Sequence, residues 1–176
     1  MADKFKDKKA TNLVDYTVNV NRVVKVTKGG KRFSFSALVV VGDQEGSVGI
    51  GLGKSREVSL AITKAANQAR KKMITIPLRG MTIPYDVTGR HGASKVIIRS
   101  ASKGTGVIAG GAMRSVMEAL GIKDILAKSL GSSNRQNVVK ATLNAFAKLR
   151  SATQLAKMRD KTVHELVGKR DVAASA

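Results

Sequence analysis

The segment from residue 16 to residue 41, YTVNVNRVVKVTKGGKRFSFSALVVV, decides how the chain folds. Apolar and polar residues alternate along its first part, which is the period of a half-buried β-strand. The Lys28-Gly29-Gly30-Lys31 sequence then supplies the glycines of a tight hairpin turn, since glycine adopts positive φ angles without strain. Alternation resumes from Phe33 to Val41. The segment therefore predicts two antiparallel strands joined by a short turn.

A third strand and a helix are predicted next. Val48, Ile50 and Leu52 share one strand face, and the opposite face carries only glycine. Bare glycines in a strand indicate that another backbone approaches closely. A helix is expected from a cap near Ser55. Its apolar stripe at helical spacing consists of Val58, Ile62, Ala65, Ala69 and Met73. The first unit is thus predicted to be β-β-β-α, with the helix covering one sheet face.

The second half predicts another α/β unit, beginning between Pro77 and Pro84. Strands are expected at 82–88, 95–99 and 122–130, the first two separated by a turn at Gly89-Arg90-His91-Gly92. Helices are expected at 109–120 and after the capping pattern of Ser133 and Gln136. The predicted fold class is α+β: two small two-layer α/β domains, arranged β-β-β-α and β-β-α-β-α. The predicted boundaries are a disordered basic arm at 1–15, domains at 16–79 and 80–150, and a C-terminal extension at 151–176.

The charge of the chain is strongly positive and evenly spread. Thirty-two Lys and Arg oppose twelve Asp and Glu, a net charge of +20. Residues 1–80 and residues 81–176 each carry 16 basic and 6 acidic groups, so each part is +10. A compact protein with such a surplus repels itself unless a polyanion neutralises it. A phosphate backbone that contacts both halves is the partner that meets this need.

Composition disfavours several other functions. The absence of Cys excludes disulfides and fits a reducing cytoplasm, and two His make no plausible metal site. No apolar stretch approaches the ~20 residues of a membrane span. Aromatic residues make up only 3% of the chain, so base stacking is not expected to dominate binding. We therefore expect no metal, cofactor, small-molecule substrate or membrane partner.

Two glycine-rich motifs nevertheless resemble nucleotide sites. GIGLGKS at 49–55 departs from a phosphate-binding P-loop, because Val48 stands where that motif requires its first glycine. GTGVIA at 104–109 fits the dinucleotide fingerprint, and Asp124 follows at a rough distance for the ribose carboxylate. The alternative for 104–109 is a tight turn whose exposed backbone packs on another macromolecule. The neighbouring Gly110-Gly111 pair would also permit a close approach.

The tip of the predicted hairpin is the most basic local feature. An edge strand charged only for solubility usually mixes signs, and this tip has no acid near it, so contact with RNA phosphates is favoured. Lys54 and Arg56 are further candidates, because the free N–H groups of a helix start attract phosphate. Arg70, Lys71 and Lys72 fit either phosphate contact or the charge bias of a helix C-terminus. The candidate residues of the tip are Arg22, Lys25, Lys28, Gly29, Gly30, Lys31 and Arg32.

Five segments resemble the family of the fifth protein of the bacterial small ribosomal subunit. They are VTKGGKRFSF at 26–35, VVGD at 40–43, GLGK at 51–54, ASKGTGVIAGGAMR at 101–114 and LAKSLGSSN at 126–134. The resemblance runs in the same order from about Tyr16 to Val167. Its departures are minor: Leu52 stands where an aromatic is common, and Ser100 where a proline is usual.

This resemblance implies a first domain similar to double-stranded-RNA-binding folds and a second domain with a fold shared by several ATP-using kinases. It implies a structural, non-enzymatic protein of cytoplasmic small ribosomal subunits, bacterial or organellar, at the rRNA neck and the messenger RNA entry channel. The eighth small-subunit protein is expected against the second domain. Further rRNA contacts are implied for Phe33, Ser132, Ser133, Asn134 and Arg135. Contacts with the fourth small-subunit protein, tied to decoding accuracy, are implied for Lys103, Gly104, Thr105, Gly106, Gly110, Gly111 and Arg114.

Two rival functions stay open from the residues alone. The first is a small nucleotide-dependent enzyme, which would bind ATP or NAD saturably. The second is a nonspecific DNA-compacting protein, which would bind duplex DNA and ribosomal RNA alike.

Overall fold

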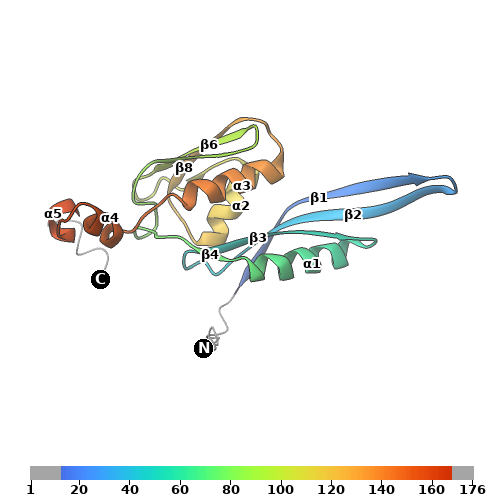
Figure 1. Cartoon of the computed structure of the whole chain (residues 1–176), viewed down its shortest axis with the longest axis horizontal. Helices are drawn as coiled ribbons and strands as arrows, with labels where there is room; N and C mark the ends of the chain where they lie inside the picture. Colours follow the sequence, from blue (N-terminus) through green and yellow to red (C-terminus); the bar gives the residue numbers. More distant parts are fainter. Residues whose placement is uncertain (1–12, 168–176) are drawn as a thin grey trace.

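The computed structural model describes residues 13–167, which form two four-stranded sheets and five helices (Figure 1). The predicted β-β-β-α order of the first unit is confirmed, and a two-residue edge strand, β4, follows it. The predicted basic arm falls mostly outside the described residues, but Val14 and Asp15 already belong to β1. The elements are β1 (Val14–Thr27), β2 (Gly30–Gly42), β3 (Ser47–Ser55), α1 (Val58–Lys71) and β4 (Ile74–Thr75), with antiparallel strands in the order β1-β2-β3-β4.

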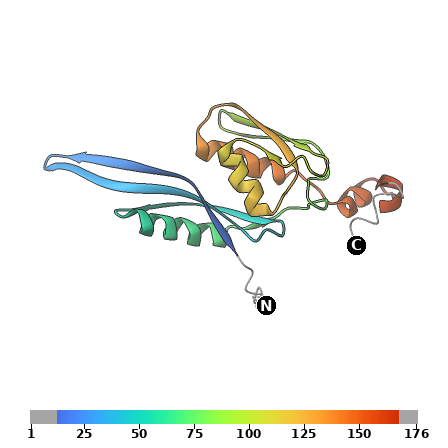
Figure 2. The same ribbon diagram turned by 180° about the vertical axis from the view of Figure 1, so that it is seen from behind.

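β1 and β2 form the predicted hairpin, which turns at Lys28 and Gly29. Thr27 pairs with Gly30, whose φ of +126° favours glycine. β3 pairs with β2 only as far as Ser55, which lies opposite Phe35. The outer part of the hairpin therefore extends without a third strand, and Figures 1 and 2 show it reaching well beyond α1.

The glycine face of β3 receives helix α1, as the sequence predicts. A Cβ built on Gly51 would lie 1.9 Å from the carbonyl oxygen of Ala65, and one on Gly53 would lie 2.1 Å from that of Ala61. The helix backbone thus rests directly on the strand. So close an approach leaves room only for small side chains. Ala65 and Ala69 of the predicted stripe are therefore buried, whereas Val58 is exposed and Ile62 and Met73 are only partly buried. The buried residues of α1 are Ala61, Ala65, Ala66 and Ala69.

The predicted start of α1 is also wrong. The N-cap is Glu57 rather than Ser55, and Ser55 is the last residue of β3. Glu57 has an extended backbone, with φ −113° and ψ 145°, and its side chain makes no capping hydrogen bond. Pairing of Ser55 with Phe35 keeps it in the strand and delays the helix.

The second unit has the predicted order with one added strand, β7, which pairs parallel to β8. The predicted turn at residues 89–92 starts too early, because Gly89 lies inside β5 and the chain turns at Gly92 and Ala93. A Cβ on Gly89 would lie 2.1 Å from the carbonyl oxygen of Ala141, so this glycine admits the backbone of α3 instead of a turn. The elements are β5 (Val87–His91), β6 (Ser94–Ser100), β7 (Val107–Ile108), α2 (Gly111–Leu120), β8 (Ile125–Gly131) and α3 (Arg135–Phe146), with strands in the order β5-β6-β8-β7.

Capping side chains fix the helices near the C-terminus. Asn134, not Ser133, is the N-cap of α3, and its side chain accepts a hydrogen bond from the Gln136 N–H. The expected extension contains two short helices, α4 (Ala152–Met158) and α5 (Val163–Val167). Ser151 and Gln154 form a capping box at the start of α4. Residues 168–176 of that extension lie outside the described part.

The two units share one hydrophobic core. Leu38 and Val40 of β2 belong to the same buried cluster as Val116 of α2 and Phe146 of α3. Helix α2 thus packs on the first sheet, on the face opposite α1, and also beneath the second sheet (Figure 2). A Cβ on Gly42 would lie 2.0 Å from the Ala119 carbonyl oxygen, so backbone meets backbone at this junction. The predicted fold class, α+β with two small two-layer α/β domains, is confirmed.

The loop between β2 and β3 completes the junction. The Gln44 N–H donates to the Ala119 carbonyl oxygen at 3.0 Å, at the end of α2. Asp43 holds the loop in shape, because its carboxylate accepts hydrogen bonds from the backbone N–H groups of Glu45 and Ser47. Partial burial raises the pKa of Asp43, but the hydrogen bonds from Ser47 and Glu45 outweigh it, and the pKa lies below its usual 3.8.

Candidate nucleic-acid interface

The hairpin tip carries its cations on both faces of a two-stranded ribbon. Lys25 lies directly opposite Arg32, on the face that does not turn toward α1, and Lys31 lies opposite Val26 on the other. All three cations are exposed. Like charges directly opposite each other destabilise a strand pair. No Asp or Glu occurs between Asp15 and Asp43, so no acid within this segment offsets the repulsion.

Arg22 and Phe33 join these cations through a contact across the strands. The Arg22 guanidinium carbon lies 3.9 Å from the centroid of the Phe33 ring, which is a cation–π distance. Phe33 remains 45% exposed. The pair fixes the direction of the Arg22 side chain on the α1-facing side of the ribbon. Predicted site residues from both strands are thus brought together beyond the end of β3.

A groove at the foot of the hairpin brings together predicted residues from both units. Lys54 of β3 and Arg135 of α3 line this hollow, whose volume is about 210 Å³. Arg135 Nη1 donates to Asn19 Oδ1 at 2.7 Å, which ties α3 to β1. Asn19 and Asn21 also line the groove and were missed by the sequence analysis. The sequence feature that could have identified them is that both are polar residues in the alternating segment 16–26.

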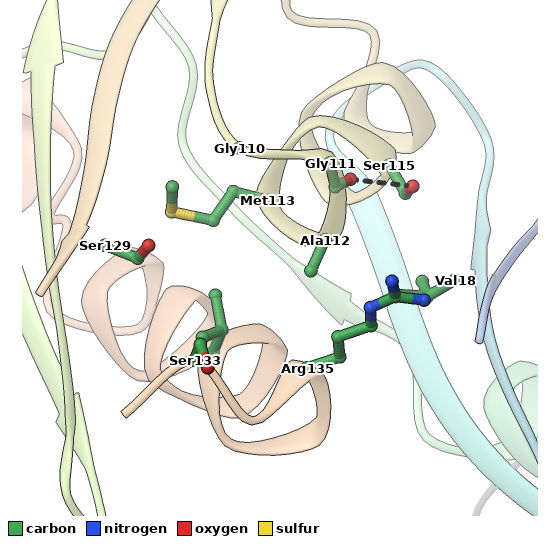
Figure 3. Close-up of a pocket in the computed structure, with 10 residues that line it drawn as sticks. Val18, Gly110, Gly111, Ala112, Met113, Ser115, Ser129, Ser133 and Arg135 are labelled. Atoms are coloured by element: carbon green, nitrogen blue, oxygen red, sulfur yellow. Dashed lines mark hydrogen bonds between the residues drawn. The ribbon is translucent and has the colours of Figure 1, made fainter. Parts of the chain in front are cut away.

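Ser132 and Ser133 lie beside this groove but differ in role. The Ser132 Oγ accepts from the Asn134 N–H at 3.3 Å, and the Ser132 carbonyl oxygen accepts from Ser94 Oγ at 2.8 Å. Ser132 therefore shapes the turn before α3. Ser133 is exposed and lines a second hollow of about 470 Å³, between the first turn of α2 and the start of α3 (Figure 3).

This second hollow joins residues that the sequence analysis assigned to different partners. Gly110 and Gly111 form one wall, while Ser133 and Arg135 form the facing wall (Figure 3). Small side chains leave the space open, and Val18 of β1 closes it toward the first sheet. The predicted RNA-binding and protein-binding residues are therefore neighbours in space.

The basic cluster at the end of α1 lies apart from the hairpin tip. The 14 residues of α1 span ~21 Å, and the cluster lies at the end away from Arg56. Arg70 is already paired, because its Nη2 lies 3.0 Å from Asp15 Oδ2. Lys71 and Lys72 are exposed. The structure thus places Lys54 and Arg56 at the foot of the hairpin and leaves these three residues elsewhere.

The turn at 104–106 is built around a buried carboxylate. Asp124 is only 6% exposed, and its Oδ1 accepts hydrogen bonds from the N–H groups of Gly104 and Gly106, both at 2.9 Å. These glycines have φ angles of +92° and +78°, which favour glycine. Asp124 therefore stabilises the turn from inside instead of binding a ribose. The turn N–H groups that would cradle a pyrophosphate are already used.

The other nucleotide-like motif fails for a steric reason. The glycine faces of Gly49, Gly51 and Gly53 are filled by the backbone of α1, so no phosphate fits there. Among residues 13–167, no three His, Asp or Glu side chains gather as a metal site. No helix in the same range is long and apolar enough to cross a membrane.

The surface of the 103–114 segment is available to a partner. Lys103, Gly104 and Arg114 are exposed, whereas Thr105 is half-buried and its Oγ1 donates to the Ser102 carbonyl oxygen. Arg114 Nη2 donates to the Val107 carbonyl oxygen at 3.3 Å, which holds its side chain along the segment. A Cβ on Gly111 would meet no atom within 4 Å, so nothing in the described chain requires glycine there.

These features define a class: a basic, two-domain α+β protein that presents cations and bare backbone to other macromolecules. Residues 13–77 match the family model of ribosomal protein S5, N-terminal domain, and residues 89–159 match that of ribosomal protein S5, C-terminal domain. The chain belongs to the uS5 family of small ribosomal subunit proteins. It is accordingly a structural, non-enzymatic constituent of the small ribosomal subunit, located with it in the cytoplasm.

Curated relatives agree over nearly the whole chain. The small ribosomal subunit protein uS5 of Gluconacetobacter diazotrophicus is 52% identical over 171 residues, covering 97% of this chain and 89% of the relative. That of Granulibacter bethesdensis is 51% identical over 170 residues, covering 96% and 90%. That of Pelagibacter ubique is 51% identical over 167 residues, covering 94% and 98%.

Proposed function

We propose that the chain holds small-subunit rRNA with the outer part of its β1–β2 hairpin. The observation that carries this proposal is the cationic tip itself. The tip extends beyond β3, and Lys25 lies directly opposite Arg32 in it. The whole segment between Asp15 and Asp43 contains no Asp or Glu. Each cation that neutralises a phosphate releases a condensed counterion, which favours binding. The clustered positive charge therefore destabilises the hairpin when it is free and stabilises its contact with a phosphate backbone.

The groove at the hairpin foot is the second proposed RNA contact. Lys54 and Arg135 supply charge, and Asn134 supplies an exposed polar side chain. Phe33, on the α1-facing side of the ribbon, belongs with the proposed contact at the tip, and Arg56 lines a separate hollow that also includes Lys54. Lys71 and Lys72 form a separate, weaker contact, since Arg70 beside them is paired with Asp15. We place this RNA at the neck of the subunit, near the messenger RNA entry channel, on the basis of family resemblance.

The 103–114 segment is proposed as the contact with the fourth small-subunit protein, and thereby as a support of decoding accuracy. The eighth small-subunit protein is assigned to the second domain on the same resemblance. A Cβ at Gly111 would meet no atom within 4 Å, so packing within residues 13–167 does not require glycine there. A closely packed partner at this segment would require it.

The hairpin proposal is tested by directed cleavage of rRNA. The chain contains no Cys, so Lys28→Cys creates its only thiol, to which iron-EDTA is attached. In reconstituted small subunits, we expect hydroxyl radicals from position 28 to cut rRNA strongly at a few nearby nucleotides. Lys157→Cys on α4, at the opposite end of the molecule, serves as the matched control (Figure 1). Cleavage from position 157 with none from position 28 would exclude the tip as an rRNA contact.

The protein contact is tested by adding bulk at Gly111. Gly111→Leu should leave folding intact, because its Cβ meets nothing within 4 Å, but it should obstruct a closely packed partner. We expect increased miscoding when this variant replaces the wild-type chain in cells, measured with a misreading reporter. Gly111→Ser is the smaller control. Normal misreading by ribosomes that contain the Leu variant would contradict the assignment.

A further inference from the structure

The two sheets of the molecule differ in how they are covered. The first sheet packs against α1 on one face and α2 on the other. In the second sheet, alternate residues such as Val96, Ile98 and Ile125 are buried toward α2 and α3. No element among residues 13–167 covers its outer face, which is bare in both views (Figures 1 and 2).

This open face combines apolar side chains with cations. The strand register places Lys95 between Arg90 and Leu130, and Lys128 beside Ile97. Leu126 and Leu130 are 37% and 41% exposed. Within the described residues, no ion pair involves Arg90, Lys95 or Lys128. Arg99, farther along β6, has Asp86 at 3.6 Å as its partner.

We propose that the open face of the second sheet docks a protein whose surface has an apolar centre rimmed by Asp and Glu. Ile97, Leu126 and Leu130 would be buried against that centre, and burial of apolar surface is the main favourable term in protein association. Arg90, Lys95 and Lys128 would pair with the acidic rim, because complementary charges steer and orient association.

Other occupants fit less well. Phosphates gain nothing from Ile and Leu, and the face presents no aromatic ring on which a base could stack. A second copy of this chain would bring the same cations together, which repels. The inference goes beyond the proposed contact at 103–114. It rests on the proposed assignment of a small-subunit protein to the second domain, for which it names the face and the chemistry of the contact.

A photo-crosslinking residue at position 130 tests the proposal in purified small subunits. We expect it to label a protein peptide that carries Asp or Glu. With Lys95→Glu and Lys128→Glu added, the yield should fall by about tenfold, because like charges would then face each other. Lys123→Glu with Lys157→Glu is the matched control and should leave the yield unchanged. Labelling of rRNA, labelling of nothing, or a yield indifferent to the charge reversal would overturn the proposal.

A second measurement separates this inference from the proposed function. Lys95→Ala with Lys128→Ala should leave the salt dependence of rRNA binding by the isolated protein unchanged. A decrease of about two in that slope would make the face an RNA contact and overturn the inference. If the wild-type protein itself bound rRNA without salt dependence, the proposed function would fail instead.

Discussion

Replacing Lys28, Lys31 and Arg32 together with Ala is expected to reduce the salt dependence of rRNA binding by about three units of slope. The slope relates the logarithm of the binding constant to that of the salt concentration, and each lost phosphate contact removes about one unit. Folding should be unaffected, because all three side chains are exposed. Removing three like charges also relieves the repulsion between Lys25 and Arg32 across the strands.

Filter binding or fluorescence anisotropy over a series of salt concentrations measures this slope. The matched control replaces Lys123, Lys157 and Lys161 with Ala, because these lysines are equally exposed but lie away from the hairpin. The control should change the slope by less than about one unit. Equal slopes for the hairpin variant and the wild type would show that the tip carries no phosphate contact.

Gly51→Val is expected to cause the largest loss of stability of any single substitution considered. Its Cβ would lie 1.9 Å from the Ala65 carbonyl oxygen and 2.8 Å from the Ala69 nitrogen. Both neighbours are backbone atoms of α1, so no side-chain rotation relieves the overlap. The helix must move away from the sheet, and the free energy of unfolding should fall by about 3 kcal/mol or more.

Urea unfolding followed by circular dichroism measures the effect. Gly51→Ala serves as the milder variant if the Val protein does not fold, and it too should be clearly destabilised. Gly111→Ala is the control, since its Cβ would meet no atom within 4 Å, and its stability should stay within about 1 kcal/mol of the wild type. A wild-type unfolding midpoint for Gly51→Ala would refute the account of helix–sheet packing.

The sequence predicted the fold where a signal is local. Alternation from Tyr16 to Val41 and the glycine turn gave the hairpin, and the bare face of β3 correctly indicated a close backbone. The same type of residue misled at Gly89, because a glycine that admits a helix looks like a glycine that makes a turn. The stripe on α1 was predicted correctly at Ala65 and Ala69 but not at Val58, which is exposed, because contact with glycines selects alanine.

The candidate site was predictable in part. The excess of cations without acids was visible at the tip, so those residues could be named in advance. That the tip extends beyond the sheet depends on where β3 ends, which the residues did not reveal. The groove with Asn19 and Arg135 joins positions 116 residues apart, and only the packing of the two units brings them together. The role of Asp124 could not be predicted from the sequence either, because its hydrogen-bond donors are backbone N–H groups, those of Gly104 and Gly106.

Sedimentation of the tagged chain with small ribosomal subunits at high salt tests the central claim most directly. The account predicts that the wild-type chain travels with the subunit. The variant in which Lys28, Lys31 and Arg32 are replaced with Ala should be released at a lower salt concentration. A wild-type chain that stays at the top of the gradient, or a variant retained as firmly as the wild type, would contradict it.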